Sequence, residues 1–274
     1  MGETVARIYG DRQMKAAFSS AALATLALWA GPASAADSDV ELAKKLSNPI
    51  ANLISVPLQS NLDCCIGDGD AAKYTLNIQP VVPLSLAPDV NMIVRTILPI
   101  VAEGETRPGA GGHFGVGDIT QSFFFSPSKA GGVIWGVGPV FLWPIGASGI
   151  GSDKWAAGPT FVALRQSGPV TIGVLANHLW SYAGAAHADA VSATFVQPFV
   201  TYTYPDTTTV SLNTETSYDW THRAWTVPIN VGISHIYAFS GQKAQLQFGG
   251  RAFAVSPDGP NLGVRFAATF LFPK

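Results

Sequence analysis

The sequence contains few charged residues for its length. Lysine, arginine, aspartate and glutamate together make up 12% of the 274 residues, whereas 47% are hydrophobic. An ordinary soluble domain is roughly 25% charged, so the usual water-facing surface is difficult to build from this composition. The formal net charge of −2 gives no indication of nucleic-acid binding, and we predict no nucleic-acid partner. The length is typical of a single domain.

Long hydrophobic runs are missing after the N-terminal region. Lys15 precedes the apolar run 16–30, and Ala33-Ser34-Ala35 follows it, which is the order of parts in a secretory signal. We therefore predict a signal peptide over residues 1–35, with Met14 as an alternative start. No later run reaches the roughly 20 apolar residues that a membrane helix requires. A membrane location would therefore depend on strands.

Cysteine is scarce as well. The two cysteines, Cys64 and Cys65, are neighbours in the sequence, and a disulfide between adjacent residues is strained and joins no distant elements. A metal site would need further ligands, and the nearby candidates are Asp63, Asp68 and Asp70. We assign the cysteines no role and predict neither a metal nor another cofactor.

What the sequence has in abundance is alternation between apolar and polar residues. In 210–220 the even positions carry Val, Leu, Thr, Thr, Tyr and Trp, and the odd positions carry Ser, Asn, Glu, Ser and Asp. Successive side chains of a strand point to opposite faces, so such a segment has one apolar and one polar face. About twelve strands of this kind are expected, at 52–62, 73–84, 90–100, 114–126, 132–144, 155–166, 170–182, 190–204, 208–220, 224–237, 242–254 and 262–272.

This pattern in an exported chain predicts an all-β fold, a transmembrane antiparallel up-and-down β-barrel, over residues 52–274. Short turn sequences alternate with longer links such as 101–113 and 145–154, as expected of periplasmic turns and extracellular loops. A short N-terminal helical segment is predicted within residues 36–51, because Asp39 is a suitable N-cap and Pro49 stops the helix.

Four residues fit this prediction poorly. Pro80 and Pro198 fall inside predicted strands, although proline lacks the N–H that a central strand uses. Gln121 and His178 are polar residues that fall on the lipid-facing side of their strands. Bulges, strand ends or an interfacial depth would accommodate them.

The apolar faces are expected to meet lipid, with aromatic residues of the strand ends at the two membrane interfaces. The predicted interface aromatics are Trp135, Trp143, Trp155, Trp180, Tyr202, Tyr218, Trp220, Trp225, Phe270 and Phe272. The polar faces would then surround a lumen. The predicted lumen-lining and selectivity residues are Arg95, Asp118, Asn213, Glu215, Asp219, Asn230, Gln245, Gln247, Arg251 and Arg265. The alternative, a soluble sandwich with the aromatics in its core, agrees less well with the signal and the sparse charge.

The charged residues of the predicted lumen have both signs. Three arginines, at 95, 251 and 265, face three acids, at 118, 215 and 219, and we expect pairs across the lumen. Such pairs act either as a network that props the barrel or as a selectivity device, and the sequence leaves both open. The mixed signs argue against a strongly ion-selective pore.

Two kinds of outer-membrane barrel enzyme have residue patterns that a sequence can reveal. A phospholipase would place a histidine and a serine two residues apart on the lipid-facing side, but Trp180 lies two residues after His178. A protease would gather acids and histidines at the extracellular rim, where His187, Asp189 and His222 fall in the predicted topology. Hydrated loop residues explain this second set more simply than a catalytic group does. We predict that the protein is not an enzyme.

Several short motifs resemble a known family of bacterial outer-membrane proteins. They are 48–59 (NPIANLISVPLQ), 95–99 (RTILP), 117–119 (GDI), 125–127 (FSP), 136–139 (GVGP), 213–215 (NTE) and the closing 271–274 (LFPK). The family is known as "MetA-pathway of phenol degradation" or transporter proteins, and some members carry the label neuromedin U. The resemblance covers nearly all of the mature chain. It implies an outer-membrane barrel that takes up small hydrophobic or aromatic compounds, and it supplies no catalytic residues.

Residues and resemblance together predict a channel or transporter of the cell outer membrane for passive uptake of small, hydrophobic or aromatic compounds. The alternatives are a closed structural or adhesion barrel and a hydrolase at the extracellular rim. The expected partners are outer-membrane lipid, a small-molecule solute and the barrel-assembly machinery. The oligomeric state, the solute and a plugging role for residues 37–51 are left open by the sequence.

Overall fold

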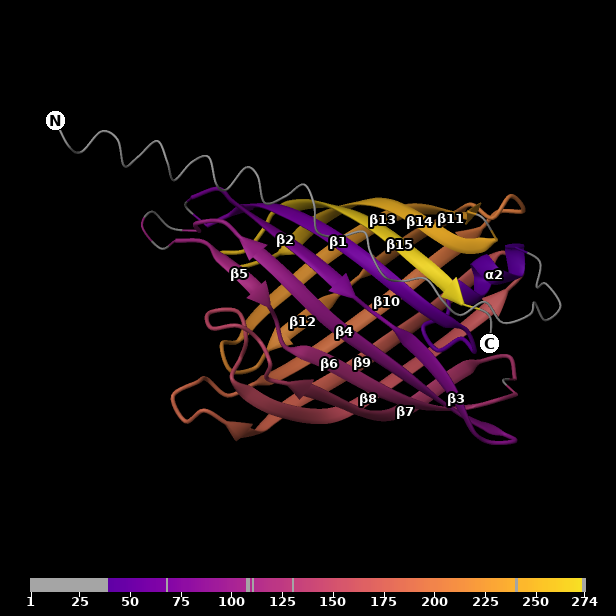
Figure 1. Cartoon of the computed structure of the whole chain (residues 1–274), viewed down its shortest axis with the longest axis horizontal. Coiled ribbons are helices and arrows are strands. Elements are labelled where there is room, and N and C mark those ends of the chain that lie inside the picture. Colours follow the sequence, from indigo (N-terminus) through magenta and orange to yellow (C-terminus); the bar gives the residue numbers. More distant parts are fainter. Residues whose placement is uncertain are drawn as a thin grey trace. The chain divides into compact units, whose positions relative to one another are not determined.

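The computed structural model describes residues 39–67, 69–106, 109, 111–129, 131–239 and 241–272, so the predicted signal peptide lies outside the described residues. Over these residues it contains one helix, α2 (Asp39–Leu46), and fifteen strands (Figure 1). The strands are β1 (Ile54–Ile66), β2 (Ala71–Ile78), β3 (Val81–Ala87), β4 (Val90–Glu103), β5 (His113–Val116), β6 (Ile119–Pro127), β7 (Ile134–Trp143), β8 (Lys154–Ser167), β9 (Val170–Gly184), β10 (Ser192–Thr203), β11 (Thr209–Thr214), β12 (Thr216–Asp219), β13 (Ala224–Phe239), β14 (Gln242–Val255) and β15 (Leu262–Phe272).

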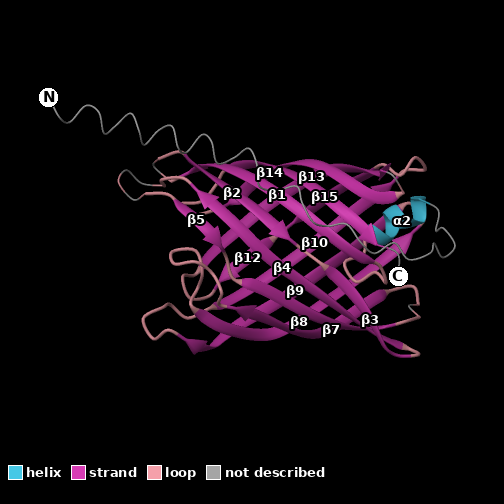
Figure 2. Cartoon of the chain, viewed as in Figure 1, coloured by secondary structure: helices cyan, strands magenta, loops and turns pink. Residues whose placement is uncertain are grey.

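The strands form one closed antiparallel barrel (Figure 2). Each strand pairs with its neighbours along the chain, and β15 pairs with β1 from Ile54 opposite Phe272 to Cys64 opposite Leu262. Three barrel strands are each divided in two: β2 with β3, β5 with β6, and β11 with β12. The fifteen segments therefore make twelve barrel strands, which confirms the predicted fold class and strand number.

Prolines explain the three interruptions. Between β2 and β3 lies Pro80, and the N–H of Gln79 donates to the carbonyl of Pro57 at 2.9 Å. Between β5 and β6, the Gly117 N–H donates to the Pro99 carbonyl at 2.8 Å. The register on both sides of Glu215, between β11 and β12, places it opposite Pro228. Because proline donates no ladder hydrogen bond, the pairing is interrupted at each point.

The connections differ between the two ends of the barrel. One end, here called the turn end, has the short links 88–89, 168–169 and 240–241 together with 128–133 and 204–208. The other, the loop end, has the longer links 104–112, 144–153 and 185–191 as well as 67–70, 220–223 and 256–261. In outer-membrane barrels the short turns are periplasmic and the longer loops extracellular. The helix α2 and the end of β15 both lie at the turn end (Figure 1).

The two faces of the barrel differ in polarity. Along β15, Leu262, Val264, Phe266 and Phe270 are exposed on the outside, and the alternate residues Arg265, Ala267, Thr269 and Leu271 are buried. The same alternation along β13 exposes Ile229, Val231 and Ile233 and buries Asn230 and Ser234. An apolar outer face of this kind is suited to contact with lipid.

The predicted interface aromatics lie at the two ends of this apolar face. Trp143, Trp155, Trp180, Tyr218 and Trp225 lie on strand ends next to loop-end links, and Trp220 is the first residue of the link 220–223. Trp135, Tyr202, Phe270 and Phe272 lie on strand ends next to the turn end. Rings contact each other on the loop-end side, with centroids 5.4 Å apart for Trp143 and Trp155 and 4.6 Å apart for Tyr218 and Trp225.

The two polar residues expected to face lipid have partners on neighbouring strands. Gln121 donates from Nε2 to Thr96 Oγ1 at 3.1 Å. His178 Nδ1 lies 2.7 Å from Thr194 Oγ1, which also accepts a hydrogen bond from the indole N–H of Trp220 at 2.8 Å. These bonds satisfy the Gln121 amide N–H and one ring nitrogen of His178, groups that would otherwise be costly on an apolar surface. The other ring nitrogen of His178, Nε2, is buried without a partner among the described residues. Of the helices in the described part of the chain, none is long and apolar enough to cross a bilayer.

Candidate functional site

The segment before β1 lies across the turn end of the barrel. Leu42 and Ala43 of α2 pack against Ile236 and Leu271, two residues of the inward-facing sets of β13 and β15. The helix carries acidic residues in its first turn and lysines in its last. Charges in these positions interact favourably with the helix macrodipole and stabilise the helix. Apolar burial thus holds α2 against the inner wall.

Polar contacts extend this attachment to both sides of the barrel. Lys243 Nζ on β14 lies 2.5 Å from Asp39 Oδ1, and Gln166 Nε2 on β8 donates to the Lys44 carbonyl at 2.8 Å. Beyond the helix, Ile50 belongs to a buried cluster with Ile93 of β4, Phe124 of β6, Val162 and Leu164 of β8 and Leu175 of β9. The segment 39–53 is therefore fixed to nearly opposite walls and partly closes the turn end.

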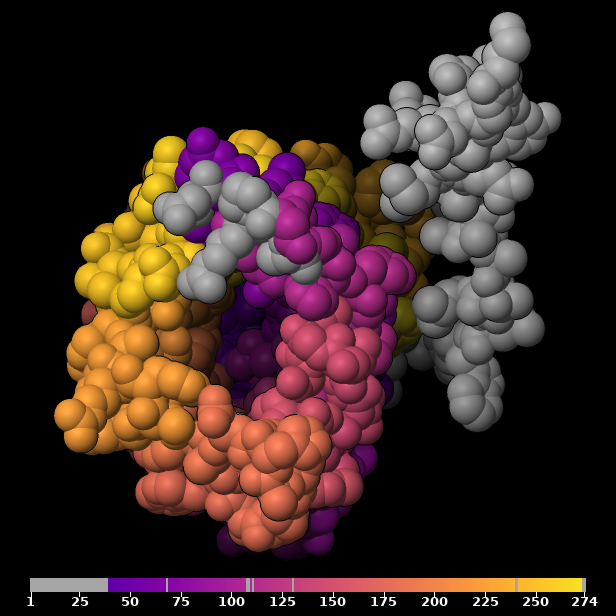
Figure 3. Space-filling view, turned by 90° about the vertical axis from the view of Figure 1, so that its left-hand side faces the viewer, coloured from indigo at the N-terminus to yellow at the C-terminus, as the bar shows by residue number. Residues whose placement is uncertain are grey.

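Two cavities lie inside the barrel. The turn-end cavity, of about 240 Å³, lies between the segment 45–53 and residues of the wall that include Arg95, Phe199, Gln245 and Thr269. The central cavity, of about 440 Å³, is lined by residues farther toward the loop end, among them Asn77, Asn177, Glu215 and Arg265. From the loop end the barrel is visibly hollow (Figure 3).

The two cavities meet at a polar neck. Gln79, Arg95, Gln197, Asn213 and Gln247 line both cavities, and they come from β4, β10, β11, β14 and the gap between β2 and β3. We call this set the neck. Four amides and one guanidinium thus lie between the turn-end cavity and the central cavity.

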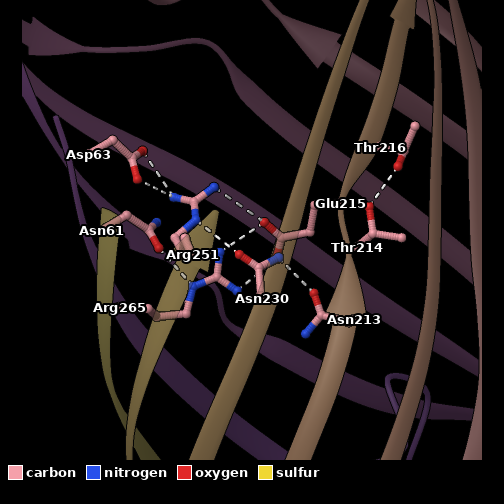
Figure 4. Close-up of polar contacts among 9 residues, drawn as sticks. All are labelled: Asn61, Asp63, Asn213, Thr214, Glu215, Thr216, Asn230, Arg251 and Arg265. Atoms are coloured by element: carbon pink, nitrogen blue, oxygen red, sulfur yellow. Dashed lines mark hydrogen bonds and ion pairs between the residues drawn. The ribbon is translucent and has the colours of Figure 1, made fainter. Parts of the chain in front are cut away.

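A network of charged residues occupies one wall of the lumen (Figure 4). Glu215 accepts two hydrogen bonds from Arg265, both at 2.8 Å, and lies 3.8 Å from Arg251. Arg251 Nη1 also reaches the two carboxylate oxygens of Asp63, at 3.1 and 3.0 Å. Bidentate arginine–carboxylate pairs are strong and geometrically specific. The network therefore ties β1, β14 and β15 to the gap between β11 and β12.

Three asparagines complete this network. Arg265 Nε donates to Asn61 Oδ1 at 2.7 Å, and Arg251 Nε donates to Asn230 Oδ1 at 3.0 Å. Asn230 Nδ2 in turn donates to Asn213 Oδ1 at 2.9 Å. Since buried charges are tolerated when they are paired and hydrogen-bonded, these bonds stabilise ions that the barrel wall largely encloses.

Arg95 occupies a different position from the other two lumenal arginines. Its Nη2 donates to Gln79 Oε1 at 3.0 Å, and among the described residues it forms no ion pair. The turn-end cavity is lined by Arg95 and Lys45 and, within the described chain, by no acidic residue. The central cavity is lined by Arg95 and Arg265 and by one acid, Glu215, which Arg265 already binds. Arg95 therefore provides positive charge to both cavities.

The remaining predicted lumen residues have separate positions. Gln245 lines the turn-end cavity. Asp118 lies between β5 and β6, where its carboxylate accepts hydrogen bonds from the backbone N–H groups of Gly146 and Ser152 at 2.9 and 2.7 Å and from the Ser152 hydroxyl at 2.6 Å. Asp118 thus anchors the loop 144–153 and makes none of the expected pairs with the lumenal arginines.

Asp219 lies at the rim of the loop end. Its Oδ2 is 2.8 Å from Nδ1 of His222, and the other ring nitrogen of His222 is 3.4 Å from Asp189 Oδ2. The hydrogen bond with Asp219, and secondarily its charge, raises the pKa of His222 above the usual value. The cluster links the loop 185–191 with the loop 220–223, and its side chains are exposed to solvent.

Sequence reasoning missed Asp63 and Asn61 as partners of the lumenal arginines. Both lie on β1, which extends to Ile66 and not to residue 62 as predicted. Asp63 is buried, at 6% exposure. A signal was available in the alternation Gln59, Asn61, Asp63, which continues the polar face of the strand beyond its predicted end.

Comparison with known proteins gave structural neighbours alone, since no family model and no curated protein matches the chain. An outer membrane channel from Pseudomonas putida F1 matches with a TM-score of 0.63 at 13% identity, over 80% of this chain and 96% of that one. Outer membrane phospholipase A from Escherichia coli matches with a TM-score of 0.46 at 10% identity, over 79% and 96% of the two chains. A porin matches with a TM-score of 0.40 at 11% identity, over 80% and 99%.

The likeness to the Pseudomonas channel shows a shared barrel fold, and the other two structures are too different to add to it. The outer face of the present barrel is apolar and has aromatic residues at both ends. Fold and outer face together place this protein in the outer membrane.

Proposed function

We propose that this protein is an outer-membrane channel for passive uptake of small solutes. The observation that supports this proposal is the pair of cavities joined at the neck inside a closed barrel. A closed structural barrel would have its interior filled by side chains, whereas this one retains cavities of about 240 and 440 Å³. Twelve strands lie between the filled interior of small barrels and the open channel of sixteen-stranded porins. Side chains and the N-terminal segment therefore determine how far the lumen opens.

The solutes that we propose are small compounds with an apolar part, including aromatic ones, in line with the resemblance of the sequence to phenol-pathway outer-membrane proteins. The central cavity supports this proposal because its wall is partly apolar, with Ile97, Leu175, Leu179, Ala193 and Phe195. Its volume of about 440 Å³ falls within the roughly 300–1,000 Å³ typical of small-molecule sites. The proposed permeation route passes from the loop end through the central cavity, the neck and the turn-end cavity.

The segment 39–53 is proposed to restrict this route at the periplasmic side. It lies against the turn-end cavity, and the contacts described above that hold it are one small apolar cluster, one exposed ion pair, the hydrogen bond from Gln166 and the Ile50 contact. A restraint of this size is weak enough to move without unfolding the barrel, because local opening needs far less free energy than global unfolding. We propose no catalytic role for the rim cluster of Asp189, Asp219 and His222.

Stepwise conductance of the purified mature protein in planar bilayers tests the proposal. The comparison is with a variant that lacks residues 39–51, which is expected to conduct more because the turn end is cleared. Both proteins must first show the heat-dependent electrophoretic mobility of a folded barrel. If neither folded protein conducts ions or passes any solute in liposome swelling, the channel proposal is wrong and the closed structural barrel takes its place.

A further inference from the structure

We propose that the neck is a carboxylate-binding site and that the solutes of this channel are small monocarboxylates with an apolar body. This inference rests on the proposed channel function and deepens it by naming the substrate class. It is carried by the position of Arg95, by the charges that surround it and by the apolar wall opposite.

The first step is the charge of the lumen. Five ionisable groups line the central cavity or are linked to its lining by ion pairs: Arg95, Arg251, Arg265, Asp63 and Glu215. The two acids are bound by Arg251 and Arg265, at distances of 2.8 to 3.1 Å. Three cations and two anions leave one positive charge, and Arg95 is the cation of this set that forms no ion pair within the described chain. The region of the central cavity therefore carries one positive charge that no ion pair balances.

The second step is the geometry of Arg95. A guanidinium has five N–H donors in a planar fork and binds a carboxylate through two parallel hydrogen bonds. One nitrogen of Arg95, Nη2, donates to the neutral amide oxygen of Gln79 at 3.0 Å. This bond uses one of the five donors, so further N–H groups remain for a solute on a side chain that lines both cavities. Arg95 also lines both cavities, so a solute that moves from one to the other must pass it.

The third step is the partner that the rest of the site fits. The central cavity places Leu175, Leu179 and Phe195 on its β9 and β10 wall, while Arg95 comes from β4. A solute with its carboxylate at Arg95 can therefore place an apolar body against those side chains. The other neck residues, Gln197, Asn213 and Gln247, are amides whose N–H groups also donate to anionic oxygens. An uncharged hydrophobic solute would leave the Arg95 charge unpaired.

Binding of two probes to the full mature protein in lipid nanodiscs tests this inference. The probes are 4-fluorobenzoate and 4-fluorobenzamide, which share the apolar ring and differ in charge, and fluorine line broadening reports their affinity. Charge-assisted hydrogen bonds contribute more than neutral ones, so we expect the benzoate to bind about tenfold more tightly than the benzamide. Arg95→Gln should remove this preference, and Arg95→Lys should retain part of it because the charge remains without the fork.

Arg165→Gln is the matched control, because Arg165 lies exposed near the turn end of β8 and lines neither cavity. It should keep the preference of the wild type. Equal binding of the two probes by the wild type would overturn the inference whether or not the Arg95 variants fold. If the wild type conducts yet binds both probes equally, the carboxylate site is wrong and the channel stands. If it conducts nothing and passes no solute, the channel itself is wrong.

Discussion

Glu215 is the acidic residue that pairs with two of the lumenal arginines. Its carboxylate binds Arg265 at two points and lies close to Arg251, and all three side chains are largely enclosed by the wall. Removing one partner of a buried pair leaves an uncompensated charge. We expect Glu215→Gln to lower the free energy of unfolding by about 3 kcal/mol, measured by urea unfolding in lipid vesicles with tryptophan fluorescence.

Two comparisons make this prediction specific. Asp39→Asn breaks the exposed pair with Lys243 and should cost no more than about 1 kcal/mol. Combining Glu215→Gln with Arg265→Met should cost less than the sum of the single variants, because the double variant leaves fewer buried charges unpaired. Additive costs would show that Glu215 and Arg265 do not interact as the structure indicates.

His222 is the residue that makes the loop end sensitive to pH. Its pKa is raised, first by the hydrogen bond with Asp219, so the cluster stabilises the loops when the imidazole is protonated. The stabilisation is complete below the ordinary histidine pKa of about 6.5 and is lost as pH rises through the raised value. We expect trypsin to cleave after the neighbouring Arg223 more slowly at acidic pH than at alkaline pH, after correction for the protease's own pH dependence on an unfolded substrate.

The matched variants are His222→Asn and His187→Asn. The first should abolish the corrected pH dependence because it removes the titrating group between the two carboxylates. The second changes a histidine in the adjoining loop 185–191 and should leave the dependence in place. The same pH profile in wild type and His222→Asn would show that another group controls the loops.

At the scale of elements, the N-terminal segment is the part most easily moved. Leu42 contributes to the small cluster that holds α2 on β13 and β15. Replacing a buried leucine with alanine costs roughly 2–5 kcal/mol in a packed core. Because few contacts hold this segment, the loss of one of them should weaken its attachment strongly. We therefore expect Leu42→Ala to raise the open probability in planar bilayers and to speed trypsin cleavage after Lys44 and Lys45.

Leu262→Ala provides the control for this prediction. Leu262 is exposed on the outer face of β15, at 56%, and contacts no part of the lumen surface described above. Its replacement should leave both measurements unchanged. Equal conductance of wild type and Leu42→Ala, with both folded, would mean that α2 does not restrict the channel.

The strands could be predicted from sequence because a side-chain period of two is a local property. The segments predicted at 90–100, 170–182 and 262–272 fall within β4, β9 and β15. The interruptions could not be placed, because each depends on a proline of the same or a neighbouring strand and on the register between them. Glu215 lies opposite Pro228 only once β11, β12 and β13 are paired.

The sequence predicted which residues face the lumen but not which of them pair with each other. Arg265 and Glu215 were expected on the inner face, and the structure places them in contact. Asp63 fell just beyond the strand predicted at 52–62, whereas β1 continues through it to Ile66, with Cys65 at a φ of 65°. Closure of the barrel through β1 and β15 then brings Asp63 to Arg251, a contact between residues far apart in the chain.

At the scale of the whole barrel, polar side chains are separated from apolar ones, and this separation determines both location and function. Charged and amide side chains face the lumen, and the exposed large hydrophobic residues, such as Leu212, Val231 and Phe266, face outward. The low charge content of the chain follows from this arrangement, because a lipid-facing surface requires no ionised groups. Closure through β1 and β15 pairs the two terminal strands and leaves no open sheet edge in the bilayer.

This separation predicts that the same added charge lowers stability far more on the outer face than in the lumen. Val231 lies near the middle of β13 and is 54% exposed on the outside, flanked by Leu212 and Gly250. An arginine on the lipid face near the bilayer midplane costs about 2–4 kcal/mol, so Val231→Arg should lower the free energy of unfolding in vesicles by that amount. Gln245→Arg places the same side chain in the turn-end cavity and should cost far less, because polar side chains line that cavity. In detergent-free buffer, both variants should aggregate and lose a single particle size. If the two variants were equally stable in vesicles, the outer face would not be in contact with acyl chains, and the membrane location would have to be abandoned.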